Sequence, residues 1–247
     1  MVSTTPTLTM LNLGPGSIVA QRYEVCERIG SGGMGLVFRV IDRDLNDQIV
    51  ALKLLHPHLA QDDQLFKRFR NEVLIARTLS HPNIVRLHDI GRAEGGFSYI
   101  SMEFVDGCSL RDRIEAGMSA TRPEGVKPLS FEEGQVILYY ILSAVAYAHG
   151  KDVVHRDLKP ANVLLTKSDE VKLADFGTAR ISGMNTSLTQ TGQVIGTPDY
   201  MSPQQIRGDV LDASCDIYAL GIMAYEIATG RRPFSAESPV ALAFKHL

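Results

Sequence analysis

The sequence contains no tryptophan, and aromatic residues make up only 7% of its 247 positions. Proteins that bind single-stranded nucleic acid stack the bases on aromatic side chains, and this composition gives no support for such a surface. The formal net charge of −3 also provides no basic surface for DNA, RNA or an anionic membrane. We therefore expect a function that involves no nucleic acid.

Cysteine is equally scarce. The three cysteines are Cys26, Cys108 and Cys215, and no two of them form a C-x-x-C pair. An odd number without paired spacing is typical of reduced thiols, and it predicts neither a disulfide framework nor a structural zinc site.

Long apolar runs and targeting signals are missing as well. No stretch approaches the roughly 18 uninterrupted apolar residues of a membrane-spanning helix, so we expect no membrane segment in this chain. The first residues, "MVSTTPTLTMLNLGPG", lack the basic and apolar regions of a signal peptide. They indicate a disordered polar tail over residues 1–18. Together with the reduced cysteines, these absences predict a cytoplasmic location.

The sequence contains a first part rich in strand-forming segments and a second part rich in helix-forming segments. Hydrophobic residues make up 45% of the chain, which is enough for a sizeable core. Strand-forming segments come first and surround a single helical pattern; they lie at 22–30, 35–43, 48–55 and twice within 83–105, with the helix at 62–80. Long apolar helices follow, at 131–150 and 214–230, with short strands at 162–166 and 171–175. This order predicts an α+β fold of two lobes joined near residues 103–109.

A glycine-rich segment, "IGSGGMGLVF", contains Gly30, Gly32 and Gly35 in a G-x-G-x-x-G pattern. Such a pattern also occurs in an ordinary hairpin turn. In a dinucleotide-binding fold, a helix would follow the glycines, whereas strand-forming residues follow here. The pattern therefore favours a strand–loop–strand whose bare backbone can approach phosphate groups.

Several charged residues are open to two interpretations when each is taken alone. Lys53 in "VALK" is either a lysine on an edge strand that extends to solvent or a buried, paired charge. Glu72 is either its partner or a surface charge. Asp157 and Asn162 lie five residues apart in "HRDLKPAN", which Pro160 is expected to keep extended. Asp175 in "DFG" is either part of a turn or, together with Asn162, a source of oxygen ligands for magnesium.

The order of these segments resolves the alternatives. Glycine loop, strand lysine, helix glutamate, "HRDLKPAN", "DFG" and "GTPDYMSPQQ" follow one another as in the protein kinase signature. From about residue 20 to its end the chain resembles a protein kinase of the Ser/Thr branch. The segments "GSGGMGLVF", "TQTGQVIGTPDYMSPQQ" and "SPVALAFKHL" are most similar to the bacterial eukaryotic-like Ser/Thr kinases. The resemblance implies a small antiparallel β lobe with one main helix, about 19–104, and a mainly helical large lobe, about 105–247.

The resemblance also implies an activity and its residues. The γ-phosphate of Mg·ATP, or of Mn·ATP, would pass to Ser or Thr hydroxyls of proteins. Asp157 would accept the hydroxyl proton, assisted by Lys159, while Glu72 orients Lys53 and the metal ions bind Asn162 and Asp175. The residues implied to contact ATP are Ile29, Gly30, Ser31, Gly32, Gly33, Met34, Gly35, Val37, Ala51, Lys53, Met102, Glu103, Val105 and Leu164.

Regulation is implied by residues in and around the activation loop. Thr189 and Thr191 match an autophosphorylated pair of the bacterial relatives, although two solvated loop threonines are the alternative. A phosphate there would give Arg156 a charged partner and order the loop. Thr197 would bond the catalytic loop, and Asp216 would anchor the backbone of that loop. Signal transduction, and a homodimer formed back to back or through activation loops, are further implications.

Two departures from the family pattern stand out. The family usually has glutamate where Gln204 stands, and we expect Gln204 to accept only a neutral hydrogen bond. The chain also stops at Leu247, before the last helices of the family fold, so we expect exposed apolar surface on the large lobe. A fragment of a longer, membrane-anchored protein and a short gene product both remain open. The competing functions are a non-catalytic kinase-like binding module and, more remotely, a small-molecule kinase.

Overall fold

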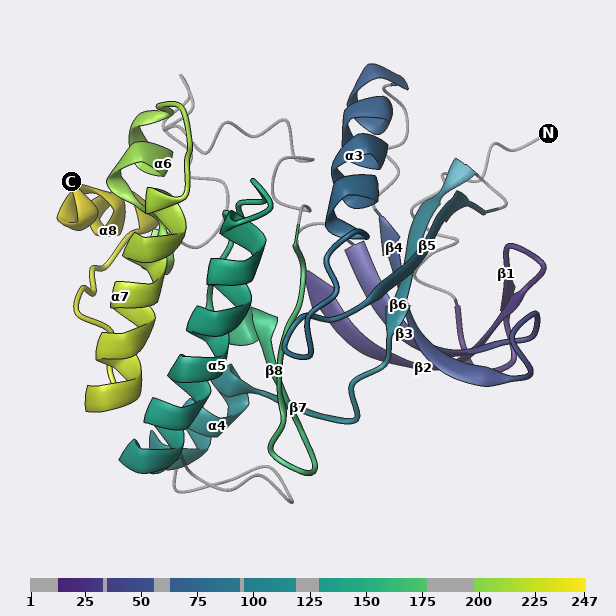
Figure 1. The fold of residues 1–247 in the computed structure, drawn as a ribbon, viewed down its shortest axis with the longest axis horizontal. Helices are drawn as coiled ribbons and strands as arrows, with labels where there is room; N and C mark the ends of the chain where they lie inside the picture. The colour runs from purple at the N-terminus through teal and green to yellow at the C-terminus, as the bar shows by residue number, and fades with distance from the viewer. Residues whose placement is uncertain (1–12, 33–34, 56–62, 94–95, 119–128, 177–197) are drawn as a thin grey trace. The chain divides into compact units, whose positions relative to one another are not determined.

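The computed structural model describes residues 13–32, 35–55, 63–93, 96–118, 129–176 and 198–247 (Figure 1). The chain divides into two compact units. Unit 1 comprises Met1–Thr78 and Arg86–Phe104, and unit 2 comprises Leu79–Val85 and Val105–Leu247.

Unit 1 is built on an antiparallel six-stranded sheet with the order β1-β2-β3-β4-β6-β5. Its elements are β1 (Ile18–Val19), β2 (Tyr23–Gly32), β3 (Gly35–Asp42), β4 (Gln48–Leu55), α3 (Asp63–Ala76), β5 (Leu87–Arg92) and β6 (Ser98–Glu103). The largest side chains at its centre, among them Tyr23, Phe38 and Leu52, are almost fully buried. All five strands and the helix that the sequence predicts within residues 22–105 are present, together with a short β1.

The start of the structured chain corrects the predicted extent of the tail. Val25 accepts a hydrogen bond from Gly16 N and donates one to Ser17 O, each at 2.8 Å. Ile18 and Val19 then pair with Glu24 and Tyr23. These backbone bonds satisfy an edge that β2 would otherwise leave open, so unit 1 includes residues that the sequence assigned to the tail.

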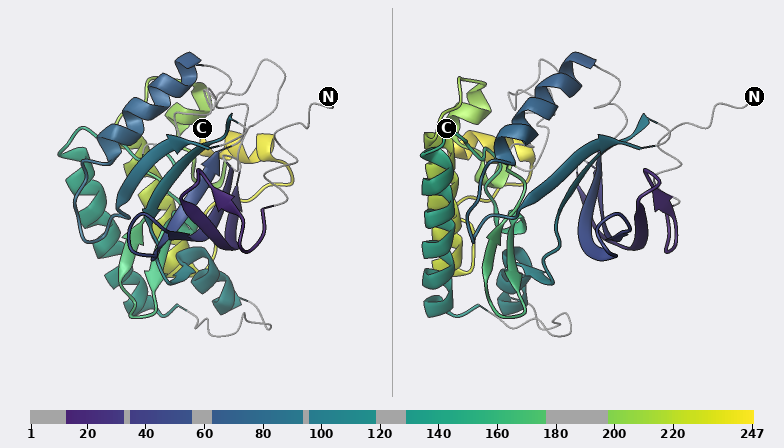
Figure 2. Two further views of the ribbon diagram at one scale, coloured as in Figure 1. Left: turned by 90° about the vertical axis from the view of Figure 1, so that its right-hand side faces the viewer. Right: turned by 45° about the vertical axis from the view of Figure 1, so that its right-hand side comes forward.

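Unit 2 is mainly helical and carries a small antiparallel sheet of order β7-β8-β9. Its elements are β7 (Gly107–Ser109), α4 (Leu110–Met118), α5 (Phe131–His149), η2 (Pro160–Asn162), β8 (Val163–Thr166), β9 (Val171–Leu173), η4 (Pro198–Tyr200), α6 (Pro203–Arg207), α7 (Ser214–Thr229) and α8 (Pro239–His246). Figures 1 and 2 show α5 and α7 packed side by side. The sequence predicts both long helices and strands β8 and β9, but it does not indicate β7, α4 or α8.

Local chemistry explains where the long helices begin and end. At the start of α5 the Ser130 hydroxyl accepts from Glu133 N, and the Glu133 carboxylate accepts from Ser130 N. This capping box satisfies two amides that the helix itself cannot. Helix α7 ends at Gly230, whose φ of +74° suits the residue that follows a helix. The predicted boundaries of both helices are therefore confirmed.

Residues 79–85 pack with unit 2, although they lie inside the range expected for the small lobe. Val85 N donates to Leu173 O, and Leu173 N donates to Asn83 O, at 2.9 and 2.8 Å. The Asn83 amide adds a bond to Val171 O at 2.9 Å. A segment outside the regular elements packs with whichever neighbour pairs its backbone.

The surface of unit 2 exposes several large apolar side chains. Val136 and Tyr139 on α5 and Ile217 on α7 are more than half exposed. None of the helices among the described residues is both long and apolar enough to span a bilayer.

Candidate active site

In unit 1, Lys53 is held on an interior strand. It lies opposite Val37 on β3 and Ile100 on β6, and it is only 6% exposed. The edge-strand alternative is therefore wrong, because β4 has hydrogen-bonded neighbours on both sides. Burial of an ammonium group is costly unless it serves a negative partner. Glu72 is half-buried in α3, within the same unit.

The glycine-rich loop joins β2 to β3, which excludes the strand–helix arrangement of a dinucleotide-binding fold. Gly35 has a φ of +150°, and a Cβ there would lie 1.8 Å from Leu54 O. A Cβ on Gly30 would only touch the Val37 side chain, and one on Gly32 would meet nothing within 4 Å. The fold of unit 1 therefore requires only Gly35 among these three glycines. Gly33 and Met34 lie outside the described residues.

The residues implied to hold the adenine ring lie on strands, except Val105, which lies between β6 and β7. Ala51 on β4 is the cross-strand partner of Met102 on β6, and both are buried. Glu103 ends β6 and already donates its N–H to Arg86 O at 2.9 Å. Val105 opens the main part of unit 2, and Leu164 is half-buried on β8. Ile29 and Ser31, two further residues implied to contact ATP, are exposed on β2.

Unit 2 brings three of the predicted site residues together. One carboxylate oxygen of Asp157, Oδ2, lies 2.7 Å from Lys159 Nζ and 3.1 Å from Asn162 Nδ2. The same Asn162 nitrogen also donates to the main-chain oxygen of Asp157 at 2.8 Å. The expectation of an extended loop is corrected here, since residues 160–162 form a turn of 3₁₀ helix with Pro160 at its first position. Proline is tolerated there because that N–H has no partner to lose.

The backbone before Asp157 is strained and is held by a buried carboxylate. Arg156 has a φ of +68°, a conformation that costs a residue other than glycine about 1–2 kcal/mol. Asp216 on α7 accepts from His155 N and Arg156 N, each at 2.8 Å. It also bonds His149 Nε2 at 2.7 Å and is 1% exposed. The predicted role of Asp216 as an anchor of this loop is confirmed.

Two hydrogen bonds connect this loop to the segment that carries Asp175. Ala174 N donates to Asn162 O at 2.8 Å, and His155 Nε2 bonds Ala174 O at 2.8 Å. The His155 ring also packs on Phe176, with centroids 4.6 Å apart. Because a carbonyl oxygen only accepts, His155 must carry its proton on Nε2. The loops bearing Asn162 and Asp175 are thereby fixed side by side, which the sequence spacing alone does not reveal.

The donor set suits a hard cation. Asn162 commits its amide nitrogen to Asp157, so its oxygen is the atom that it can offer to a metal. The described residues contain no group of three or more His, Cys, Asp or Glu arranged as a metal cage. Magnesium prefers few protein oxygens and completes its shell with water and phosphate, so an asparagine and an aspartate on adjoining loops fit it.

Gln204 behaves differently from the expected hydrogen-bond acceptor. Its Nε2 donates to Ser214 Oγ at 3.3 Å. Its Oε1 is buried and has no hydrogen-bond partner among the described residues. The amide therefore acts as a donor, because the nearest polar group offers it a hydroxyl oxygen.

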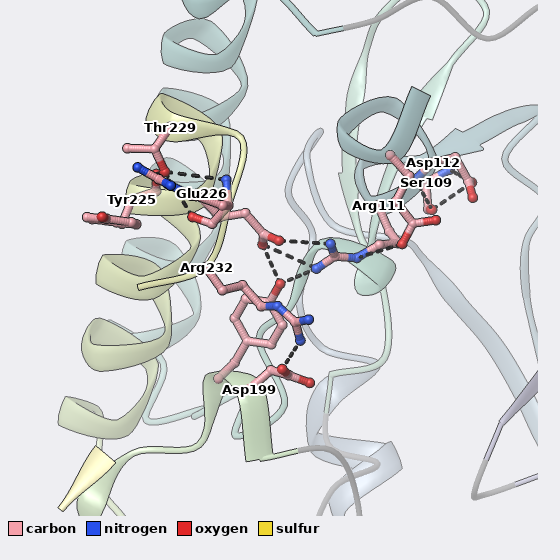
Figure 3. A network of polar contacts seen from close by, with 11 residues as sticks. Ser109, Arg111, Asp112, Asp199, Tyr225, Glu226, Thr229 and Arg232 are labelled. Carbon is pink, nitrogen blue, oxygen red and sulfur yellow. Dashed lines mark hydrogen bonds and ion pairs between the residues drawn. The ribbon is translucent and has the colours of Figure 1, made fainter. Parts of the chain in front are cut away.

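A second polar network in unit 2 was not foreseen from the sequence (Figure 3). Arg111 of α4 binds the Glu226 carboxylate of α7 through both terminal nitrogens, at 2.8 and 3.2 Å. The Tyr200 hydroxyl contacts both groups, and Arg232 pairs with Asp199. Burial and the bond to Glu226 raise the pKa of Tyr200. Through Tyr200 the network ties α4 and α7 to η4, the 3₁₀ helix that precedes α6.

Comparison with known proteins identifies the fold and its family. Residues 23–246 match the protein kinase domain family. The crystal structure of the Mycobacterium tuberculosis PknI kinase domain, C20A mutant, has a TM-score of 0.70 and 30% identity, covering 93% of this chain and 84% of that one. The chain therefore belongs to the protein kinase family, and the predicted two-lobed α+β kinase fold is confirmed.

Similar curated proteins come from bacteria. The chain is 43% identical over 231 residues to the probable serine/threonine-protein kinase PknB of Lactococcus lactis. It is 41% identical to the serine/threonine-protein kinases PknB of Mycobacterium tuberculosis over 235 residues and PrkC of Bacillus subtilis over 232. Each alignment covers 94% of this chain but only 35%, 36% and 34% of the respective relative. The resemblance to bacterial eukaryotic-like Ser/Thr kinases is confirmed, and the chain spans about a third of those proteins.

The resemblance assigns roles to three threonines, two as phosphorylation sites and one that would bond the catalytic loop. Thr189, Thr191 and Thr197 all lie outside the described residues, within 177–197. Their roles therefore remain predictions from the sequence.

Proposed function

We propose that this chain is a serine/threonine protein kinase that transfers the γ-phosphate of ATP to hydroxyl groups of proteins. The observation that carries the proposal is the Asp157 carboxylate, held by Lys159 and Asn162 in a chain of the protein kinase family. Phosphoryl transfer depends mainly on positioning and charge stabilisation, and a rigidly held carboxylate beside a lysine supplies both.

The proposed roles in unit 2 follow from these contacts. Asp157 accepts the proton of the substrate hydroxyl while the oxygen of that hydroxyl bonds the γ-phosphorus. The bond between the γ-phosphorus and ADP breaks at the same time. Lys159, 2.7 Å from that carboxylate, lies where it can also bind the transferred phosphate. The side-chain oxygens of Asn162 and Asp175 would hold magnesium, or manganese, which neutralises charge on the phosphates.

The proposed roles in unit 1 concern ATP. Lys53 would bind its phosphates with Glu72 as the orienting carboxylate, and the bare backbone at Gly30 and Gly32 would lie against them. The residues proposed to contact the rest of the nucleotide are Ile29, Ser31, Val37, Ala51, Met102, Glu103, Val105 and Leu164, with Gly33, Met34 and Gly35 completing the loop. A lysine buried on a central strand is otherwise a destabilising choice for a sheet, and this supports a functional role.

Activation is proposed to proceed by autophosphorylation at Thr189 and Thr191, with Arg156 as the cation that receives the phosphate. Self-association of two copies would allow one to phosphorylate the other. A cytoplasmic setting is proposed because ATP is available there and Cys26, Cys108 and Cys215 are free thiols.

The decisive test measures the intact mass of the purified chain before and after incubation with Mg·ATP. We expect mass increments of one phosphate, located at Thr189 and Thr191. They should be absent in Asp157→Asn, which keeps the shape of the side chain but cannot accept the proton. Lys167→Met, an exposed surface lysine of unit 2, serves as the control and should retain them.

The same experiment separates the alternative of a binding module. If calorimetry shows that ATP binds but the mass of the chain does not increase, a non-catalytic kinase-like protein is favoured over an enzyme. Phosphate transfer to a sugar or another small molecule, but not to protein, would contradict the assigned substrate class.

A further inference from the structure

The peptide bond that joins Arg156 to Asp157 is supported from several directions. Arg156 has a left-handed φ of +68°. A residue other than glycine keeps this conformation only when its surroundings impose it. Asp216 fixes the N–H groups on the amino-terminal side of this peptide. Asp157 N donates to His155 Nδ1 at 3.3 Å. The remaining polar atom is the main-chain oxygen of Arg156.

That oxygen is bonded by a side chain from another element. Gln205 Nε2 of α6 donates to Arg156 O at 2.8 Å. Gln205 lies 49 positions along the chain from Arg156 and is only 7% exposed. The bond is partly buried, and a carbonyl shielded from water is costly to leave without its donor. Gln205 therefore helps to determine how the peptide before Asp157 is oriented.

The other end of the same amide fixes the orientation of Gln205. Its Oε1 accepts from Ser202 N at 3.0 Å, and Gln205 N donates to Ser202 Oγ at 3.3 Å. Ser202 N can only donate and Arg156 O can only accept, so the amide has one orientation that satisfies both. The capping box of α6 thereby holds the nitrogen toward the catalytic loop.

We propose that Gln205 is a positioning residue that fixes the Arg156–Asp157 peptide and thereby the direction of the Asp157 carboxylate. The inference rests on the proposed kinase function, in which Asp157 accepts the substrate proton. Gln205 does not touch the reacting atoms; it acts through the backbone.

The neighbouring glutamine provides a matched comparison on the same helix. Gln204 bonds Ser214 at the start of α7 and makes no bond to the catalytic loop. The two residues have the same chemistry and adjoining positions, and they differ in what their amide nitrogen contacts.

The test uses the full chain and three variants. Gln205→Glu keeps an oxygen for Ser202 N but removes the donor to Arg156 O. Gln204→Glu makes the same change one position earlier. Ser202→Ala removes the hydroxyl from the cap and leaves the Gln205 donor in place. Steady-state transfer from radiolabelled ATP to casein gives kcat and the KM for ATP, and hydrogen–deuterium exchange reports on residues 153–158.

We expect Gln205→Glu to lower kcat about 10- to 100-fold, the range that loss of one buried hydrogen bond predicts. The KM for ATP should stay within about twofold, and exchange over 153–158 should accelerate. Gln204→Glu and Ser202→Ala should keep kcat within about twofold. Gln205→Met, which is similar in size and uncharged, replaces Gln205→Glu if that variant does not fold, and the same loss is expected.

Unchanged kcat and unchanged exchange in the Gln205 variants would overturn the inference. An equal loss of kcat in Ser202→Ala would also overturn it, since the effect would then belong to the helix cap. If the unmodified chain transfers no phosphate at all, the proposed function fails. The exchange measurement still decides in that case whether Gln205 holds the peptide.

Discussion

Lys53 in unit 1 and Asp157 in unit 2 are held in place by two different kinds of structure. The position of Lys53 is set by a regular antiparallel ladder, in which every neighbour follows from strand register. Asp157 follows Arg156, whose φ is +68° and whose backbone is bonded by side chains of α6 and α7. Asn162 of η2 bonds Asp157 itself. One functional residue depends on backbone pairing and the other on buried side-chain hydrogen bonds.

This difference has a consequence for how each region fails. The stability of a β-ladder comes from many similar backbone hydrogen bonds, so most single side-chain changes leave the ladder intact. The catalytic loop depends on a few buried polar groups, each of which leaves an unsatisfied partner when it is removed. Unit 2 should therefore be the more sensitive to conservative polar substitutions, and unit 1 to changes that block backbone approach.

The largest effect is expected from Asp216→Ala in unit 2. Three donors lose their acceptor, at about 1–3 kcal/mol each, so the free energy of unfolding should fall by about 4–6 kcal/mol and phosphate transfer should be lost. Urea unfolding followed by circular dichroism measures the change. Ile217→Ala, the exposed neighbour on α7, is the control. A loss below about 1 kcal/mol in Asp216→Ala would contradict the comparison.

Arg111→Met should follow, with a loss of about 3–5 kcal/mol, because it leaves Glu226 buried without its cation. Glu226 is 1% exposed, whereas Glu115, which also pairs with Arg111 at 3.8 Å, is on the surface. Glu115→Ala should therefore change the free energy of unfolding by less than about 0.5 kcal/mol. Equal effects of the two substitutions in chemical denaturation would show that burial does not decide the strength of this network.

In unit 1 we expect the largest loss of stability from a substitution at Gly35. Gly35→Ala combines a backbone conformation that favours glycine with a contact of 1.8 Å to Leu54 O, so we expect a loss of about 2–4 kcal/mol. Gly32→Ala has open space for its Cβ and should leave the free energy of unfolding within about 0.5 kcal/mol. Thermal unfolding compares the two. Comparable destabilisation by both substitutions would contradict the prediction, because the need for glycine would then belong to the whole loop and not to position 35.

The smallest effect concerns pH. Burial lowers the pKa of His246, which packs against Tyr218 and Phe234, below the value of about 6.5 expected in the unfolded chain. The neutral form is thus favoured by folding, and its contribution to stability is complete above pH 6.5 and lost as pH falls toward the folded pKa. The melting temperature of His246→Phe should therefore depend less on pH between 7 and 5.5 than that of the unmodified chain. Parallel curves would contradict this assignment.

The sequence carried most of the fold because its signals were local. Residues 131–149 combine a capping box with a long apolar helical pattern, and residues 48–55 form a short run of strand-forming residues. Both elements are therefore predicted at their correct positions. The elements that were missed, such as α4 and β7, are short. Residues 79–85 were expected with the small lobe because chain order alone cannot show which backbone they pair with.

For the candidate site, the sequence by itself determined which residues carry the chemistry, since motifs such as "HRDLKPAN" and "DFG" place charged and amide groups in a fixed order. It did not determine what holds them. The bonds from Gln205 to Arg156 O, from Asp216 to the same loop and from Arg111 to Glu226 join residues 49, 60 and 115 positions apart. Only the tertiary structure brings such groups within hydrogen-bonding distance, because packing of whole elements, and not local preference, sets their separation.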